Sequence, residues 1–330
     1  MKTAEEPRTK RAMNPLLTII IPTYNRWRLL CEALSTVLRE AKGLPVEVIV
    51  VDDCSTDGTW DRLKQFDNTP ILTCLRTTAN SGPGPARNVG LAAARGRYII
   101  QIDSDFLLIQ GALSKVKSAI DADHGSHPIL FFRCIEYPRL RVLDNFSGTN
   151  EITSDDMLYS DLGELLAVVD LDVLRSRDLR YPTFRSGGES IFLVQTLADR
   201  PGLFLDIPVV LYRTDVPNRI CTVDHQIEHA ADLACVADAI LELFPPGYSS
   251  RGAHPKRKRL LASGTYHLLA GHERIGRHRL VSALAQGNLP ALMPLVISFF
   301  GRRVFQHAFV RYCRHVGRAV NWDQRDVHPQ

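Results

Sequence analysis

The stretch VEVIVVDDCSTDGT, residues 46–59, runs from a strand-forming segment into two aspartates and a polar turn. Similar apolar runs recur in the first third of the chain, with helical patterns between them. The expected strands are 17–21, 46–51, 71–75 and 98–102, and the expected helices are 28–39, 58–66 and 86–95. Continuous apolar strands alternating with helices are typical of a parallel sheet covered on both faces. The sequence therefore predicts an α/β fold with a mostly parallel sheet.

The pattern changes after residue 105. It becomes mixed up to about residue 222, and then only helical periodicity remains. The expected strands are 129–135 and 203–213, and the expected helices are 170–177, 190–199, 226–244, 256–272 and 277–286, followed by a basic helical pattern to about 320. We therefore expect a C-terminal α-helical region after the sheet.

The charge is divided unevenly along the chain. The formal net charge is +4, but residues 251–330 carry 14 Lys and Arg against three acids, which leaves −7 for residues 1–250. A basic tail suggests a polyanionic partner, either a membrane surface or a nucleic acid. The apolar stretch 289–300 is too short to span a bilayer, since a spanning helix needs about 20 residues. It either lies on a membrane or packs in the core of a helical bundle.

The cysteines and the N-terminal segment indicate a reduced compartment. The seven cysteines are odd in number and contain no C-x-x-C pair, and the first fifteen residues have no signal-peptide pattern. These features favour a cytoplasmic chain over a disulfide framework.

Polar segments follow the four expected parallel strands, where open α/β sheets bind ligands. They are PTYNR (22–26), DDCSTDGT (52–59), NSGPGPARNVG (80–90) and DSD (103–105). Asp103 and Asp105 could hold Mg²⁺ or Mn²⁺ against a diphosphate, although a D-x-D triplet is also common in solvated turns. Asp52 and Asp53 either both cap the following turn, or one of them faces the cleft.

Two further segments carry candidate residues. NSGPGPARNVG is not a dinucleotide fingerprint, because it follows the third strand and its prolines remove amide donors. We expect it to start a helix at Pro85 and to present Arg87 and Asn88 to a ligand, or to be a plain helix entry. In SGGES (186–190), Glu189 is either a functional carboxylate or a capping acid of the first helical turn.

Together these segments resemble the family 2 glycosyltransferases, which are inverting enzymes of the Rossmann-like GT-A fold that use nucleotide-diphosphate sugars. The resemblance covers roughly residues 16–219. The matching stretches are TIIIPTYNR (18–26), VEVIVVDDCSTDGT (46–59), NSGPGPARNVGLAAARGRYIIQIDSD (80–105), RSGGESIFL (185–193) and PVVLYR (208–213). It implies a flexible segment 1–15, a GT-A domain 16–222 and a basic helical region 223–330. Within the GT-A domain, 16–105 would bind the nucleotide and 106–222 would lie on the acceptor side.

The resemblance also implies roles for individual residues. The nucleotide would be held by Thr23, Tyr24, Asn25, Asp53, Asn80, Arg87, Asp103 and Ser104. Asp105 would bind the Mn²⁺ or Mg²⁺ directly, with Asp103 assisting. In the family the base usually comes from a Glu-Asp pair, which here reads Glu189-Ser190. Either Glu189 is the base, or activity depends on another acid or is lost. We favour Glu189.

The implied activity is that of a hexosyltransferase. The donor would be a nucleotide-diphosphate sugar, a UDP-sugar by the family's common base, and the acceptor a glycan or a lipid-linked glycan in envelope or polysaccharide synthesis. Residues 289–320 would hold the protein peripherally on the anionic inner face of the cytoplasmic membrane. No nucleic acid partner is expected. The alternatives are a catalytically impaired nucleotide- or glycan-binding subunit and a sugar nucleotidyltransferase.

Overall fold

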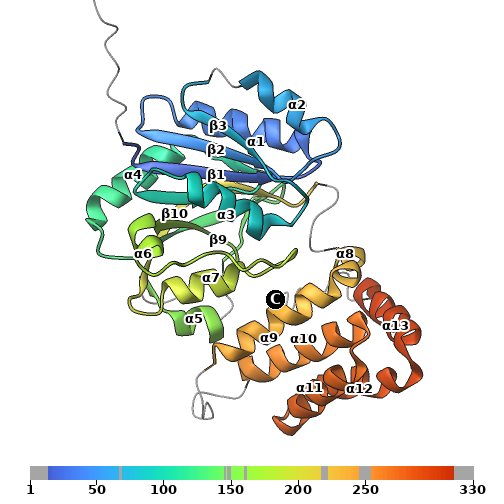
Figure 1. Ribbon diagram of the computed structural model, residues 1–330. Helices are drawn as coiled ribbons and strands as arrows, with labels where there is room; N and C mark the ends of the chain where they lie inside the picture. Colours follow the sequence, from blue (N-terminus) through green and yellow to red (C-terminus); the bar gives the residue numbers. More distant parts are fainter. Residues whose placement is uncertain are drawn as a thin grey trace, which may run out of the picture.

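The computed structural model describes residues 14–66, 69–144, 146, 150–159, 162–216, 222–244 and 254–315. Within these residues ten strands form one sheet (Figure 1). The strands are β1 (Leu17–Thr23), β2 (Val46–Asp52), β3 (Leu72–Arg76), β4 (Tyr98–Gln101), β5 (Phe106–Leu108), β6 (Ile129–Tyr137), β7 (Arg141–Val142), β8 (Glu151–Ile152), β9 (Leu165–Asp170) and β10 (Gly202–Arg213).

Helices flank this sheet and make up the described C-terminal part. The α-helices are α1 (Trp27–Glu40), α2 (Thr59–Leu63), α3 (Pro83–Ala93), α4 (Ala112–Asp123), α5 (Ser154–Tyr159), α6 (Leu171–Ser176), α7 (Glu189–Thr196), α8 (Val223–Glu228), α9 (Ala230–Glu242), α10 (His254–Ala270), α11 (Glu273–Ala285), α12 (Leu292–Ile297) and α13 (Arg302–His315). The 3₁₀ turns are η1 (Lys64–Phe66), η2 (Leu289–Ala291) and η3 (Ser298–Phe300).

The strand order is β3-β2-β1-β4-β9-β6-β10-β5. β1 pairs in parallel with both β2 and β4, and β2 pairs in parallel with β3. β9 is antiparallel to β4 and to β6, so in the middle of the sheet it runs in the opposite direction to both of its neighbours. The predicted α/β fold with a mostly parallel sheet is confirmed. The antiparallel β9 was not predicted.

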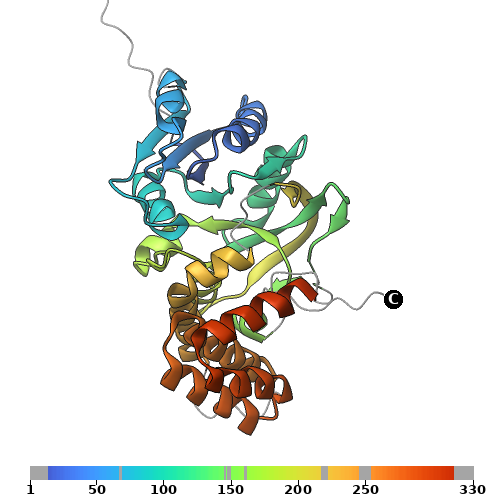
Figure 2. The same cartoon turned by 90° about the vertical axis from the view of Figure 1, so that its right-hand side faces the viewer.

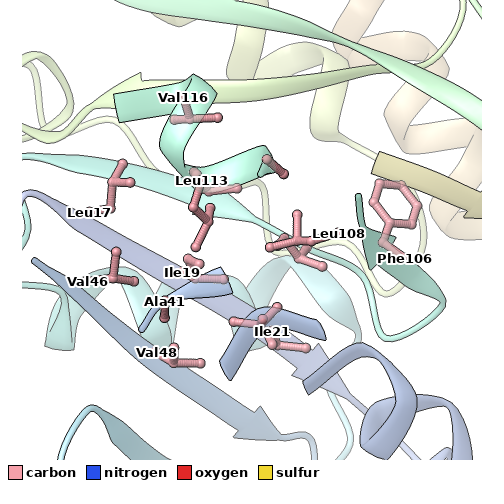
Figure 3. Packing of buried hydrophobic residues seen from close by; sticks show 14 of the residues in the cluster. Leu17, Ile19, Ile21, Ala41, Val46, Val48, Phe106, Leu108, Leu113 and Val116 are labelled. Atoms are coloured by element: carbon pink, nitrogen blue, oxygen red, sulfur yellow. The ribbon is translucent and has the colours of Figure 1, made fainter. Parts of the chain in front are cut away.

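Both faces of the sheet are covered because its central strands are apolar on both sides. Ile19 and Ile21 of β1 pack on the α1 and α4 side, whereas Ile20 packs on the opposite side with α3, α6 and α7. Figure 3 shows the first layer, where Leu113 and Val116 of α4 meet residues of β1 and β2. Each fully buried aliphatic side chain of this kind contributes about 1.5–3 kcal/mol.

The C-terminal helices have their own core, formed by α9, α10, α11 and α13. A smaller apolar cluster joins them to the sheet domain: Ile191 and Val194 of α7 pack with Val236 and Ile240 of α9. Figures 1 and 2 show the orange-to-red helices as one group beside α5 and α7. None of the described helices combines the length and the apolar character needed to cross a membrane.

Some predicted boundaries were wrong. The helix expected from Pro85 begins at Pro83, and the helix expected over 226–244 is two helices that meet at His229. The sequence left open whether residues 289–300 pack in the core of a helical bundle. Within this stretch only Ala291 and Ser298 are buried, and the large apolar side chains from Leu289 to Phe300 are mostly exposed.

Candidate functional site

A cleft of ≈ 820 Å³ lies at the carboxyl ends of β1, β2 and β4, and α8, α9 and α10 form its opposite wall. All ten residues to which the resemblance assigns a nucleotide, metal or catalytic role line this one cleft. They are Thr23, Tyr24, Asn25, Asp53, Asn80, Arg87, Asp103, Ser104, Asp105 and Glu189. These residues come from segments far apart in the sequence, which the fold brings to one sheet edge.

Arg87 links two of the predicted acids. Its side chain is buried; it donates one hydrogen bond to Asp103 Oδ1 at 2.7 Å and another to Glu189 Oε1. Its guanidinium carbon also lies 5.6 Å from the ring centroid of Tyr181, a cation–π contact. Burial lowers the pKa of Arg87, but Glu189 and Asp103 outweigh this and raise it, so the guanidinium stays charged. Arg87 therefore fixes these two carboxylates on opposite sides of one cation.

The two adjacent aspartates have separate roles. Asp52 accepts from Ser55 N at 3.3 and 3.2 Å, which caps the turn after β2. Asp53 lines the cleft, and it accepts from Ser81 N at 3.1 Å and from Gly82 N at 2.7 Å. Asp53 thus holds the loop before α3 against the sheet, and the hydrogen bonds of its carboxylate go to this loop.

Gly82 is required at the entry to α3. Its φ is +94°, and a Cβ there would lie 2.5 Å from the carbonyl oxygen of Arg185. Only glycine avoids both the strained conformation and the clash. The loop and the segment before α7 can therefore approach closely enough to close one side of the cleft.

Asn25 and Asn88 form protein contacts. Asn25 has φ +50° and its Oδ1 accepts from Thr56 N at 2.7 Å, so it joins the turns after β1 and β2 while lining the cleft. Asn88 was expected to face a ligand, which is wrong. It exchanges two hydrogen bonds with the backbone of Tyr181, because its place on α3 points it away from the cleft.

The acids after β4 fit a hard divalent cation in part. Asp103 and Asp105 offer carboxylate oxygens at the cleft, but in the described residues no group of three or more His, Cys, Asp or Glu could hold a metal. Arginines contact both acids, Arg87 on Asp103 and Arg26 on Asp105 at 3.5 Å. Two carboxylates suit Mg²⁺ or Mn²⁺ that takes its other ligands from a diphosphate and water. The donor set therefore fits a cation that binds together with a nucleotide.

Glu164 is a cleft residue that the sequence did not reveal. It is part-buried just before β9 and lines the cleft with Asp103, Asp105 and Glu189. Burial, with smaller contributions from Glu189, Asp103 and Asp105, raises the pKa of Glu164 to about 8 against the opposing effect of Arg87. The signal that could have found it is the apolar run 165–169, which Glu164 directly precedes.

Two histidines of the helical wall were also not predicted from the sequence. His225 and His229 line the cleft, with their rings 4.2 Å apart, and His225 Nε2 lies 3.1 Å from Ser186 Oγ. Burial, with a smaller effect of His229, lowers the pKa of His225 to about 4. His225 is therefore a neutral imidazole at pH 7, which can donate or accept a hydrogen bond in the cleft.

Comparison with known proteins finds similar sequences and a similar fold. Residues 18–147 match the family described as glycosyl transferase family 2. The GalNAc(5)-diNAcBac-PP-undecaprenol β-1,3-glucosyltransferase of Campylobacter jejuni is 30% identical over 172 residues, which are 49% of this chain and 54% of that enzyme. The succinoglycan biosynthesis protein ExoO of Rhizobium meliloti is 36% identical over 108 residues, 33% of this chain and 30% of that protein. The chain thus spans about half or less of these relatives.

A solved structure extends the likeness over nearly the whole fold. Staphylococcus aureus TarS 1–349 in complex with UDP-GlcNAc has a TM-score of 0.55 at 17% identity, and the match covers 92% of each chain. The mixed sheet with its C-terminal helices is therefore shared with a protein that binds a nucleotide sugar.

Proposed function

We propose that the chain transfers a sugar from a nucleotide-diphosphate sugar to a hydroxyl of an acceptor, because residues 18–147 match glycosyl transferase family 2. The observation that carries the proposal is the gathering in one cleft of the ten residues to which the resemblance assigns a nucleotide, metal or catalytic role. The acceptor is a glycan or a lipid-linked glycan of envelope or polysaccharide synthesis.

The donor is a UDP-sugar, held across the strand ends by the loops after β1, β2, β3 and β4. Two buried polar atoms of the cleft residues support a ligand there, because Thr23 Oγ1 and Arg87 Nε lack a hydrogen-bond partner in the described part of the chain. Mn²⁺ or Mg²⁺ held by Asp103 and Asp105, when bound, would neutralise charge on the departing diphosphate. Arg87, already charged and adjacent to Asp103, would contribute positive charge on the same side.

The transfer inverts the anomeric centre. The acceptor oxygen bonds to the anomeric carbon, the bond from that carbon to the diphosphate oxygen breaks, and the acceptor proton passes to a carboxylate. Glu189 is our base: it stands at the first position of α7, lines the cleft and has a half-exposed side chain. Its ion pair with Arg87 orients the carboxylate, while the exposed part of the side chain is accessible to an acceptor.

The direct test is release of UDP from a panel of UDP-sugars with Mn²⁺, with and without extract-derived acceptors. Glu189→Gln should lower turnover by about 100-fold or more, the usual contribution of general base catalysis, and leave UDP affinity unchanged. Glu242→Gln, an exposed residue of α9, is the matched control.

Other outcomes would reject the proposal. Near-normal turnover in Glu189→Gln would exclude Glu189 as the base. Binding of UDP-sugars without any turnover would indicate an impaired subunit. Pyrophosphate-dependent release of a nucleoside triphosphate would indicate a sugar nucleotidyltransferase.

We also propose that the helical region attaches the protein to the inner face of the cytoplasmic membrane. An apolar ridge on η2, α12 and η3 supports this. Its side chains are at least half exposed: Leu289, Leu292, Met293, Val296, Phe299 and Phe300. Arg302, Arg303, Arg311 and Arg314 of α13 are exposed close by in the sequence. Exposed apolar side chains next to arginines suit an anionic bilayer surface. The predicted surface 289–320 continues beyond the described residues after 315.

A further inference from the structure

The order of the strands in the sheet determines the order of the polar residues along the cleft. β2, β1, β4 and β9 lie side by side in that sequence, and each brings a polar residue to the cleft edge. Asp53 follows β2, Thr23 ends β1, Asp103 and Asp105 follow β4, and Glu164 precedes β9. Because β9 is antiparallel to β4, its beginning lies at the same edge as the end of β4.

Glu164 lies close to these acids. The pairing of β4 with β9 joins Tyr98 to Asp170 and Ile100 to Val168, and beyond this paired part Glu164 lines the cleft together with Asp103, Ser104 and Asp105. Adjacent strands are about 4.8 Å apart, so the three intervals from β2 to β9 span about 14 Å. Our proposed function lays the nucleoside at β1 and β2 and the diphosphate at β4. The next position along the edge then belongs to the sugar.

Glu164 is suited to that position by its lack of protein partners. Arg87 pairs with Asp103 and Glu189, and Arg26 pairs with Asp105. The side chain of Glu164, in contrast, forms no hydrogen bond or ion pair with any described residue. A part-buried carboxyl group in a cleft is expected to find a hydrogen-bond partner, and sugar hydroxyls can both donate to it and accept from it.

We propose that Glu164 binds a hydroxyl of the transferred sugar and so helps to select the donor. This inference rests on the proposed function, because it takes the ligand to be a nucleotide-diphosphate sugar. Glu164 would then contact the sugar alone, whereas Asp53, Thr23 and the acids after β4 contact the nucleotide part. The two parts of the ligand can be tested separately.

The experiment compares the affinity for UDP with the affinity for UDP-sugars by calorimetry, in the presence of Mn²⁺. The probes are UDP, UDP-glucose, UDP-galactose and UDP-N-acetylglucosamine. Glu164→Ala should bind UDP within about twofold of wild type and bind the preferred UDP-sugar about 10-fold or more weakly, the effect of losing a hydrogen bond to a charged or buried polar group. Glu164→Asp, which keeps the carboxyl group one methylene shorter, should give a smaller loss.

One control makes the result specific. Glu242→Gln should match wild type throughout. Equal affinity of Glu164→Ala and wild type for the UDP-sugar overturns the inference, as does an equal loss for UDP and the UDP-sugar. If the wild type binds neither UDP nor any UDP-sugar, the proposed function itself fails.

Discussion

At the scale of single residues, Glu164 makes the stability of the protein depend on pH. Its folded pKa is about 8 against an ordinary value of 4.5, so the folded chain holds this proton more tightly than the unfolded chain. The contribution of the protonated Glu164 to the free energy of unfolding is therefore complete below pH 4.5 and is lost as the pH rises toward 8.

Glu164→Gln cannot ionise and should avoid this loss. In metal-free urea unfolding between pH 5.5 and 8, the variant should become more stable relative to wild type by up to about 1.4 kcal/mol per pH unit. A stability difference that stays constant over this range would contradict the raised pKa. Glu242→Gln is the control, with a difference expected to stay flat.

The residues recovered from the sequence are those in motifs that follow apolar strands. Arg87 and Asp103 were recognisable because each stands at a fixed distance from such a strand. Neither their ion pair nor the contact of Arg87 with Glu189 could be predicted, because the partners are 16 and 102 residues apart. His225 was missed because nothing in a helical pattern shows that the helix faces a cleft.

At the scale of elements, the entry to α3 depends on the backbone of Gly82. Gly82→Ala should destabilise the protein by about 1–3 kcal/mol more than Gly43→Ala, because only the first would clash with a neighbouring backbone. Both have positive φ, but a Cβ on Gly43 would have nothing within 4 Å, whereas a Cβ on Gly82 would meet Arg185. Urea unfolding of the two variants measures this difference.

The same substitution should weaken UDP-sugar binding, since Gly82 N donates to Asp53 and both residues line the cleft. Gly43→Ala should bind the donor like the wild type. Equal stability and equal donor affinity of the two variants would show that the approach to Arg185 does not position this loop.

The elements missed from the sequence include the twelve-residue helix α4 and the strands β5 and β9. β5 and β9 have three and six residues, and β9 owes its place to antiparallel pairing with strands on both sides. The strands β1 and β2 could be predicted because each contains a continuous apolar run. In the structure all seven residues of each strand are buried. The remaining strands depend on pairing between residues far apart in the sequence, which a local sequence pattern does not reveal.

At the scale of the whole molecule, the apolar ridge and the basic α13 should attach the protein to anionic vesicles. In co-sedimentation, binding should require phosphatidylglycerol and weaken as salt rises. The double variant Phe299→Ser/Phe300→Ser should bind about 10-fold or more weakly, because both rings, each 68% exposed, would lose their burial in the bilayer.

Leu140→Ser is the matched control, an exposed apolar residue of the sheet domain that should leave binding unchanged. Binding without dependence on anionic lipid would reject the proposal. Self-association that depends on Phe299 and Phe300, without vesicle binding, would assign the ridge to a second copy of the chain.

The helix α7 sits between two packing environments. Phe192 faces the sheet, and Ile191 and Val194 face α9, while Glu189 stands at the beginning of the same helix. For protein engineering this means that the helical region is not an interchangeable module. A graft of α8–α13 onto another sheet domain would have to carry the matching face of α7, or the acid at its first turn would lose its alignment with the cleft.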